Sequence, residues 1–467
     1  MIIRLSEHQS FFLHLRKEDQ ENVIENSNEL FLNAAEFDKY HNISSKSFNK
    51  SSYRFIFNRS ANSYEIKADY CIGIDWVGNT GKFIYVEPKI NSNTSDIFSN
   101  QLDDEYLDVP KGTSEKTGLI YELDYLNMLL QTTAVPESNA EVKDLVQIDW
   151  DSQQIGIEQQ EDKLTPFLIV RFLQSLKAIV KKGLKKDYFK VQENLNNRIK
   201  GKILVSQHIK QNIFKNRITS TYCEYQVYAE DHLENRFLKK VLRFVSSYVE
   251  NHKTLFSKTY KSLDEAIRYC RPSFEFVSDT LRENELKHIK YNPFFSDYRD
   301  AINIGGYILK RFAFNITQTS TNLVSTPPFW IDMPRLFELY VFSKMMIDNS
   351  LDKKHVNYQF STYGNALDIL VSKEGFQMII DAKYKLQYKT GHLHQDIRQV
   401  AGYARLNKVR DKLNINEDRN IDCLIIYPDL KNGIDNFSLD SIIQNREPIL
   451  AYHKVYKLGV KLPLIGL

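Results

Sequence analysis

Two acidic side chains and a lysine lie in short apolar stretches near the C-terminal end of the sequence. Asp368 lies within the apolar stretch 366–371, and Asp381 and Lys383 end a second apolar stretch that begins at Met378. A short turn containing glycine separates the two stretches, so the pattern predicts two antiparallel strands. Because side chains alternate along a strand, the second carboxylate and the lysine point to the same face.

Pairing about the turn at Lys373-Glu374-Gly375 brings Asp368 opposite Asp381 or one residue away from it. An even register places both carboxylates on one face, whereas a slip of one residue separates them. Two carboxylates and the backbone carbonyl of Ala382 form the oxygen site that Mg²⁺ prefers, with Mn²⁺ as the alternative ion. Such a cation polarises a phosphate and activates a water, while Lys383 orients that water or stabilises the developing charge. These residues therefore predict a metal-dependent phosphodiesterase site.

The D/E-x-K triplet has little specificity by itself, since it occurs at least eight times in this sequence. Glu87-Pro88-Lys89 is another of these triplets, and exposed ion pairs explain most of them. Asp381-Ala382-Lys383 differs because an apolar strand precedes it and a second acid lies one hairpin back. The spacing alone leaves a nuclease site and a structural ion pair as equal alternatives.

Three further polar residues flank the hairpin in the sequence. Glu338 lies among apolar neighbours on a predicted helix, where it is either a supporting acid and metal ligand or an ordinary surface acid. Gln399 and Tyr403 are four residues apart on a later helix and share a face. They are either a surface pair or contacts that orient the site beside Lys383.

The elements expected to position these residues alternate between helix and strand. A mixed order of this kind suits a small sheet flanked by helices. The sequence predicts helices over 336–346 and 396–409, and strands over 355–360, 366–372, 376–383 and 420–427.

The whole chain is predicted to be a mixed α/β (α+β) multidomain protein, since 467 residues suffice for two or three domains. Residues 1–164 form a β-rich N-terminal domain with short strands and Asn- and Ser-rich loops. Residues 165–315 form a mainly helical, basic middle region, which starts at the capping pair Thr165-Pro166. Residues 316–467 form the domain that contains the acidic hairpin.

Charge is distributed unevenly along the chain. Between Thr94 and Asp162 there are 16 acids against 3 lysines, whereas between Arg171 and Arg217 there are 13 Lys and Arg against 2 acids. Solvated helix faces explain many such runs, but the basic one also suits phosphate contacts. The residues predicted to bind DNA are Arg171, Lys181, Lys182, Lys185, Lys186, Arg198, Lys200 and Lys202.

Several other classes of protein are disfavoured. The segment Gly78–Lys82 lacks the first glycine and the Ser or Thr of a P-loop, so it is read as a hairpin turn. Four widely spaced cysteines fit neither a zinc site nor a disulfide framework and indicate buried, reduced thiols. No apolar run reaches the length of a membrane span or a signal peptide, so a cytoplasmic protein without membrane contact is expected.

The residues together resemble a known nuclease family. The order Glu338, Asp368, Asp381-x-Lys383, Gln399-x-x-x-Tyr403 is similar to the PD-(D/E)xK nuclease core, in its branch with a QxxxY helix. The chain more closely resembles the McrC family, the nuclease subunits of McrBC modification-dependent restriction systems. The similarity is strong over about 165–430. Before residue 160 only the stretch from Gly81-Lys82 to Pro88-Lys89-Ile90 matches.

This resemblance implies a PD-(D/E)xK restriction-endonuclease-like fold for residues 316–467, with Asp368, Asp381 and Lys383 in catalysis and Glu338 as a supporting acid. It implies DNA as substrate and a separate McrB-like AAA+ GTPase hexamer that recognises modified DNA and translocates it. The N-terminal domain would engage that motor and stimulate GTP hydrolysis. Pairing of nuclease domains across two complexes is a further expectation.

Two alternatives stay open at this point. One is a stand-alone DNA repair or recombination nuclease of the same fold. The other is a scaffold that activates a motor while its own nuclease site is idle. A neighbouring gene for a P-loop NTPase distinguishes the leading hypothesis from the first alternative, and metal-dependent cleavage distinguishes it from the second.

Overall fold

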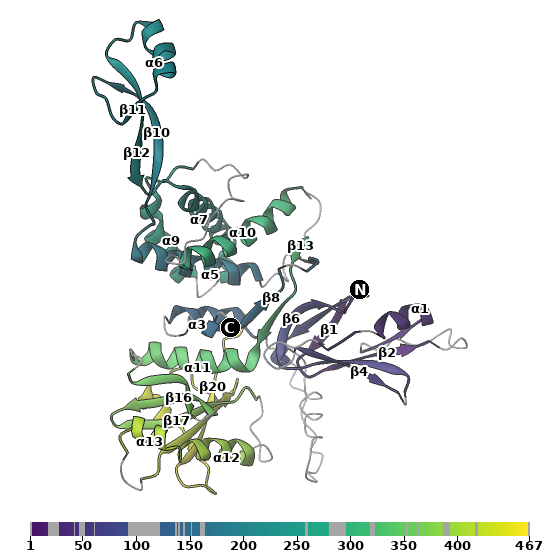
Figure 1. Ribbon diagram of the computed structural model, residues 1–467. Coiled ribbons are helices and arrows are strands. Elements are labelled where there is room, and N and C mark those ends of the chain that lie inside the picture. Colours follow the sequence, from purple (N-terminus) through teal and green to yellow (C-terminus); the bar gives the residue numbers. More distant parts are fainter. Residues whose placement is uncertain are drawn as a thin grey trace. The chain divides into compact units, whose positions relative to one another are not determined.

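The computed structural model contains two compact units, of which unit 1 comprises Met1–Ile157 with Ser325–Leu467 and unit 2 comprises Glu158–Val324 (Figure 1). Most of the predicted N-terminal and C-terminal domains thus fall in one unit, and the predicted middle region lies in the other; the three-part division itself stays a prediction. The structure describes residues 2–16, 28–41, 43–45, 52–59, 61–91, 122–135, 138, 141–142, 145–150, 152–158, 164–256, 260–279, 296–317, 323–351, 354–362, 365–385, 393–415 and 419–465.

The N-terminal part of unit 1 is built on two sheets, as its short alternating strands predict. One sheet has the order β3-β2-β5-β4 and the other β1-β7-β6-β14-β8. A shared core of aliphatic and aromatic side chains packs between them. Short helices lie at Ala34–Phe37 (α1) and Tyr125–Ala134 (α3). The strands are β1 (Ile2–Ser6), β2 (Ser10–Leu15), β3 (Glu29–Leu32), β4 (Tyr53–Asn58), β5 (Ser63–Ala68), β6 (Cys71–Trp76), β7 (Phe83–Glu87), β8 (Val146–Ile148) and β14 (Phe329–Asp332).

Strand β14 comes from the C-terminal part of the sequence, yet it pairs with β6 on one side and β8 on the other. Close approach of the strands requires Gly73 of β6, since a Cβ at that residue would lie 2.0 Å from the carbonyl oxygen of Phe329. The indole of Trp330 donates to Asp75 at 3.1 Å in the buried interior. The N-terminal sheet therefore includes the strand that leads directly into the C-terminal part.

The C-terminal part has a six-stranded sheet of order β15-β16-β17-β18-β20-β19. Helix α11 (Met333–Asn349) begins right after β14, where Asp332 caps it by accepting from the Arg335 N–H. Helices α12 (Leu393–Tyr403) and α13 (Asn407–Lys412) pack on the sheet through a shared apolar core, and Figure 1 shows α11 on the opposite side. The remaining elements are β15 (Val356–Thr362), β16 (Asn365–Lys373), β17 (Phe376–Ala382), β18 (Asp422–Pro428), α14 (Leu439–Asn445), β19 (Glu447–Pro448) and β20 (Val455–Val460).

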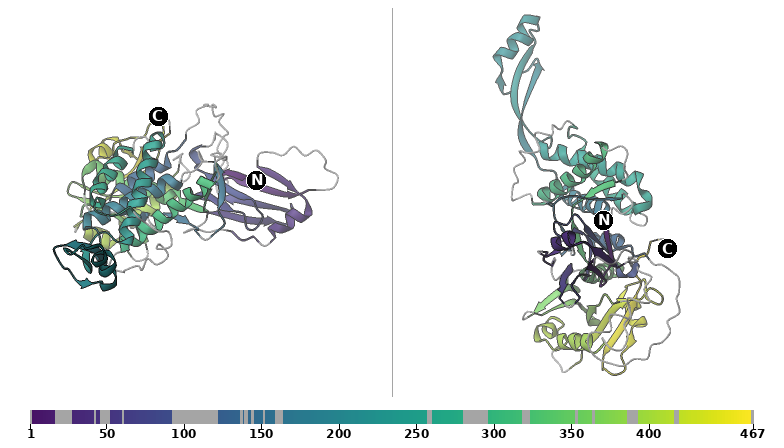
Figure 2. Two further views of the ribbon diagram at one scale, coloured as in Figure 1. Left: turned by 90° about the horizontal axis from the view of Figure 1, so that it is seen from above. Right: turned by 90° about the vertical axis from the view of Figure 1, so that its right-hand side faces the viewer.

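Unit 2 contains a group of helices and an arm. The helices are α5 (Leu164–Lys182), α7 (Leu233–Asn251), α8 (Lys253–Phe256), α9 (Tyr260–Cys270) and α10 (Ser296–Thr317). The arm projects from these helices in Figure 1 and in the right-hand view of Figure 2. It consists of β10 (Asp187–Asn196), β12 (Ser220–Ala229), β11 (Lys202–Ile203) and the short helix α6 (Val205–Gln211). Where the chain enters and leaves unit 2, β9 (Ile155–Glu158) pairs with β13 (Leu323–Thr326).

Most predicted elements are confirmed, and the mixed α and β fold class is confirmed with them. The turn at Gly78–Lys82 joins β6 to β7, with Gly78 and Gly81 at positive φ. All four cysteines are buried and unpaired. The structure differs in two places: the single helix predicted over 396–409 is two helices, α12 and α13, and the middle region contains the β arm. Most of the acidic block 94–162 lies outside the described residues.

Candidate active site

The hairpin of β16 and β17 brings the two predicted catalytic aspartates together. A two-residue turn, Glu374-Gly375, joins the strands with Gly375 at φ +81°, and Lys373 pairs with Phe376. The ladder runs to Ile369 opposite Ile380, and the same register places Asp368 across from Asp381. The Ala382 N–H donates to Asp368 Oδ2 at 2.8 Å. Of the two registers that the sequence leaves open, the structure therefore has the even one, with the two aspartates opposite each other.

Asp381 is a buried carboxylate with few partners. Its side chain is 1% exposed, and Lys383 Nζ lies 2.9 Å from Oδ2 as an ion pair. Neither carboxylate oxygen meets the geometry of a hydrogen bond with any described residue. Lys383 therefore compensates the charge of Asp381 through proximity, without an aligned hydrogen bond. Buried oxygens in this state are costly unless a further cation or donor satisfies them.

Burial and mutual repulsion change the acidity of the whole group. Burial raises the pKa of Asp368 well above its usual range, and the charges of Glu338 and Asp381 act in the same direction. Burial also raises the pKa of Asp381, although Lys383 opposes that shift. The pKa of Lys383 is lowered by burial but raised more strongly by the carboxylates around it, so the net shift is upward. The site therefore holds more negative charge than its own lysine compensates.

Glu338 approaches this group from helix α11. Tyr358 and Gln359 on β15 donate to Glu338 Oε2 at 3.4 and 3.1 Å. Burial raises the pKa of Glu338 to about 7, with the charge of Asp332 as the next cause. Gln359 has a positive φ of 48°, which is uncommon for this residue type within a strand. Tyr358 and Gln359 were not among the predicted site residues. The one signal for them in the sequence is a glutamine inside the strand predicted over 355–360.

Helix α12 holds the lysine from the other side. Lys383 Nζ donates to Gln399 Oε1 at 3.0 Å, and Gln399 Nε2 donates to the Tyr403 hydroxyl at 2.9 Å. This chain of hydrogen bonds joins the predicted QxxxY pair to the predicted DxK lysine. The Gln399 side chain can therefore fix the direction of the ammonium group.

The donor set suits a hard cation in part. Asp368 and Asp381 offer buried carboxylate oxygens close together, and Ala382 adds a backbone carbonyl on the same strand. Within the described parts of the chain, however, no three Asp, Glu, His or Cys side chains gather closely enough to hold an ion. Glu338 is thus a neighbour of the aspartate pair rather than the third member of a compact cluster, and its role as a ligand stays a prediction.

The predicted DNA-binding residues fall into two groups in unit 2. Arg171 packs against Phe167 on α5, and burial lowers its pKa. Lys185 lies in a half-buried ion pair with Glu234 at 2.8 Å, next to His232. At this end of α5, Lys182 pairs with Asp297 and Lys186 with Glu230, while Lys181 is exposed.

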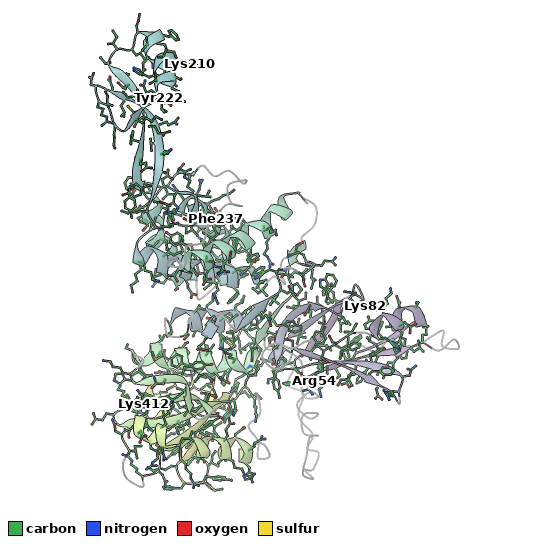
Figure 3. All side chains as sticks on the ribbon, viewed as in Figure 1. Arg54, Lys82, Lys210, Tyr222, Phe237 and Lys412 are labelled. Atoms are coloured by element: carbon green, nitrogen blue, oxygen red, sulfur yellow. The ribbon has the colours of Figure 1, made fainter. Side chains whose placement is uncertain are left out.

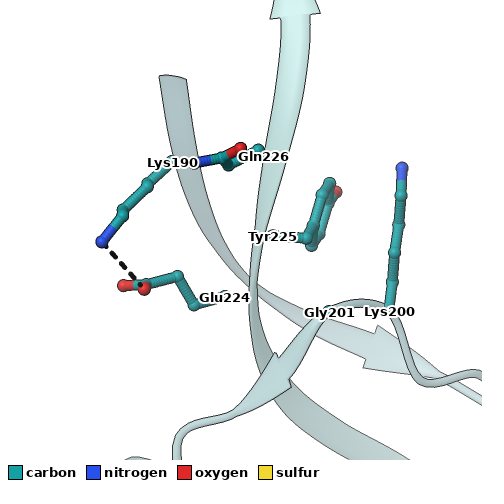
Figure 4. A pocket seen from close by; sticks show the side chains of 6 residues that line it. All are labelled: Lys190, Lys200, Gly201, Glu224, Tyr225 and Gln226. Carbon is teal, nitrogen blue, oxygen red and sulfur yellow. Dashed lines mark ion pairs between the residues drawn. The ribbon is translucent and has the colours of Figure 1, made fainter. Parts of the chain in front are cut away.

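Arg198, Lys200 and Lys202 are exposed on the arm. Lys200 lies 4.2 Å from the ring centroid of Tyr225, beside a pocket of about 470 Å³ that Lys190, Gly201, Glu224 and Gln226 also line (Figure 4). An ion pair of 3.6 Å joins Lys190 to Glu224. The far end of the arm, marked by Lys210 in Figure 3, also exposes large apolar side chains, including Phe214 at 78% and Ile218 at 94%. Sequence analysis missed this apolar tip, because its residues are scattered among polar ones without a period.

None of the described helices combines the length and the apolar composition needed to cross a bilayer.

Two solved assemblies are similar to this chain at low identity. One is a half-complex from a tetradecameric assembly of Thermococcus gammatolerans McrB AAA+ hexamers with bound McrC, with 15% identity and a TM-score of 0.37. That match covers 99% of this chain and 94% of the other. The second is the Thermococcus gammatolerans McrBC complex, with 15% identity, a TM-score of 0.29, and coverage of 74% of this chain and 88% of the other.

No curated protein sequence matches the chain. A family model does match it, over residues 66–428 of the 467, and that model describes the McrBC 5-methylcytosine restriction system component. The matched span includes the end of β5 with β6 and β7 of the N-terminal sheets, all of unit 2 and the candidate site from Glu338 to Tyr403. The chain therefore belongs to the family of McrBC 5-methylcytosine restriction system components, as its resemblance to McrC indicated.

Proposed function

We propose that this chain is the DNA-cleaving subunit of its restriction system and hydrolyses phosphodiester bonds with Mg²⁺. The observation that carries the proposal is the register of the β16–β17 hairpin, which sets Asp368 across from Asp381 with Lys383 alongside. A structural ion pair needs one acid and one base, whereas this site buries two acids beside one lysine. The excess of buried negative charge favours a bound cation.

Each residue has a role in this proposal. Asp368, Asp381 and the Ala382 carbonyl hold Mg²⁺ or Mn²⁺, and Glu338 supports them as an outer acid or a further ligand. The metal, when bound, supplies a positive charge next to the phosphate and makes a coordinated water more acidic. Lys383 places its ammonium beside the developing negative charge, and the hydrogen bond to Gln399 keeps it there. Tyr403 fixes Gln399 in turn.

The energy source is proposed to lie on another chain. The sequence has no P-loop pattern, and one of the two similar assemblies contains McrB AAA+ hexamers with bound McrC. By this analogy a McrB-like GTPase hexamer is the partner, and two such complexes can meet through their nuclease domains. The predicted contact of residues 1–164 with the motor is part of the same proposal.

The test is cleavage of plasmid DNA that carries or lacks 5-methylcytosine, with Mg²⁺, GTP and the McrB-like partner present. Asp381→Ala and Lys383→Ala are expected to lower cleavage at least about a hundredfold, because each removes a group that acts on the reacting phosphate. Lys373→Ala is the matched control, since this lysine lies on the same hairpin at the turn and stacks on Phe376. Binding of the partner and stimulation of its GTPase should be unchanged in all three variants.

The outcomes separate the alternatives. Unchanged cutting by both site variants contradicts the site assignment. Efficient metal-dependent cutting without any partner favours a stand-alone repair or recombination nuclease. GTPase stimulation with no cleavage of any modified or unmodified DNA, in either metal, favours a scaffold with an idle site.

A further inference from the structure

A buried lysine that follows a strand of the N-terminal sheet contacts the segment directly after β17, the strand that contains Asp381. Lys89 follows β7 in the stretch Pro88-Lys89-Ile90, the N-terminal motif that matched the family. Its side chain is only 4% exposed, and Nζ donates to the Tyr384 carbonyl oxygen at 2.7 Å. The same ammonium lies 4.1 Å from the Tyr384 ring centroid. Tyr384 directly follows Lys383.

Glu7, the residue after β1, completes this contact. It is fully buried, and its Oε2 accepts from the Lys89 N–H at 3.0 Å and from the Tyr384 hydroxyl at 3.5 Å. Burial raises the pKa of Glu7 to about 7, and Lys89 is the main opposing influence. An acid and a base are thus buried together, both in contact with one residue of the C-terminal part.

The contacted residue, Tyr384, lies where the chain leaves the sheet and where the β17–β18 ladder no longer supplies hydrogen bonds. Strand β17 ends at Ala382, and the Lys383 N–H still donates to Ile426, but the chain then leaves the sheet. The Tyr384 carbonyl lies beyond the β17–β18 ladder, and Lys89 supplies its donor. The Tyr384 ring also packs against Phe337 at 5.9 Å, next to Glu338 on α11. Lys89 and Glu7 therefore contact a residue that lies between two parts of the candidate site.

We propose that Lys89, together with Glu7, is a positioning residue for the candidate active site: it fixes the backbone after Ala382 and thereby the place of Lys383. The N-terminal sheet is then part of the cutting machinery as well as a docking region for a partner. This inference rests on the proposed nuclease function for its effect on cleavage. Its effect on the backbone does not depend on that function.

Three variants of the full chain test it. Lys89→Met removes the ammonium and keeps much of the volume, but it leaves Glu7 buried without its base. Glu7→Gln with Lys89→Met removes both charges, so the interior stays neutral while the donor to Tyr384 is still lost. Lys82→Met is the matched control, because this lysine precedes the same strand β7 and lies 5.9 Å from the Tyr40 ring centroid, among the N-terminal residues (Figure 3).

Two measurements are made on each variant. Hydrogen exchange by mass spectrometry should show exchange in peptides covering 381–385 that is about tenfold faster in both Lys89 variants. Exchange in peptides of α7 should stay at the wild-type rate. Cleavage by the complex with the partner should fall about tenfold or more in maximal rate, with the DNA concentration for half-maximal rate unchanged. Lys82→Met should alter neither measurement.

Wild-type exchange over 381–385 in both Lys89 variants would overturn the inference. Collapse of the whole fold in the charge-neutral double variant would also overturn it, because the pair would then serve the stability of unit 1 as a whole. If the wild-type complex cleaves no DNA, the proposed function fails, but the exchange comparison still decides whether Lys89 fixes the segment. Faster exchange with an unchanged cleavage rate would refute the link to Lys383.

Discussion

At the scale of single residues, the candidate site is distinguished by buried carboxylates whose negative charges have too few cations and hydrogen-bond donors around them. Glu87-Pro88-Lys89 has the same triplet pattern as Asp381-Ala382-Lys383, but Glu87 is partly exposed and lies 3.8 Å from Arg4. Asp381 is buried, and its oxygens accept no hydrogen bond from the described residues. Natural proteins keep such costly arrangements mainly where a ligand or a reaction needs them.

This cost leads to a prediction for Asp368→Asn. The raised pKa of Asp368 means that its charged form disfavours folding, so the amide should stabilise the metal-free protein at pH 8 by at least about 1 kcal/mol. The gain should grow as pH rises from the ordinary pKa of aspartate to the raised pKa of Asp368 in the folded wild type. Over that range the unfolded wild-type chain gives up its proton while the folded protein keeps it, so the wild type loses stability. Thermal unfolding in EDTA measures the gain, and added Mg²⁺ should stabilise the wild type more than the variant.

The control for this prediction is Asp422→Asn on the neighbouring strand β18. Asp422 accepts from Arg446 at 2.8 Å and lies 3.7 Å from Lys454, so its charge is compensated. Its amide variant should therefore be slightly less stable than the wild type. A loss of stability in Asp368→Asn as large as in the control would show that the buried aspartate does not carry an electrostatic cost.

The central residues of the site could be predicted, because a short hairpin is a local structure. The turn limited the register to two choices, and the apolar flanks indicated which face is buried. Lys89 could not be assigned in this way, because its triplet is one of at least eight of the same pattern in the sequence. Its contact with Tyr384 spans 295 residues, so no local pattern records it.

At the scale of elements, the predicted DNA-binding residues of unit 2 differ in whether buried partners hold their side chains. Lys185 is held by Glu234 and by hydrogen bonds that join the base of the arm to α7 and α10. Arg198, Lys200 and Lys202 lie on the arm itself and are exposed. The arm residues are therefore accessible for phosphate contacts, as is the exposed Lys181 at the end of α5.

We accordingly predict that changing Arg198, Lys200 and Lys202 together to alanine weakens DNA binding and flattens its salt dependence. The slope of log K against log salt should fall by about one unit for each side chain that contacts a phosphate. Changing Lys240 and Lys261, which are exposed on α7 and α9 of the same unit, is the control. Fluorescence anisotropy over a series of salt concentrations measures the slope, and an unchanged slope would mean that the arm surface is only solvated.

The strands of the arm could not be predicted from the sequence. Its strands β10 and β12 pair over ten residues, but most of their side chains are exposed or half-buried on both faces. Without a buried face there is no alternation of apolar and polar residues for a strand pattern to reveal. Helix α5, by contrast, begins at Leu164, within about one residue of the start predicted from Thr165-Pro166, because a capping pair before an apolar run is a local signal.

At the scale of the whole molecule, unit 1 is assembled from two distant parts of the sequence. Strand β14 completes the N-terminal sheet, and helix α11 with Glu338 follows it without a break. Lys89 adds a second connection through Tyr384. A long-range pairing of this kind cannot be read from local periodicity, so neither connection could be predicted from the sequence.

The assembly predicts which fragments fold. Strands β9 and β13 pair where the chain enters and leaves unit 2, so replacing 158–324 by a short Gly/Ser linker between Ile157 and Ser325 should preserve unit 1. That protein should unfold in one cooperative transition followed by circular dichroism. The fragment 316–467 alone should aggregate or melt far lower, because β14 loses both neighbouring strands and Trp330 loses Asp75. Equal stability of the two proteins would show that the C-terminal part is an independent domain, and the proposed support from Lys89 would then be dispensable.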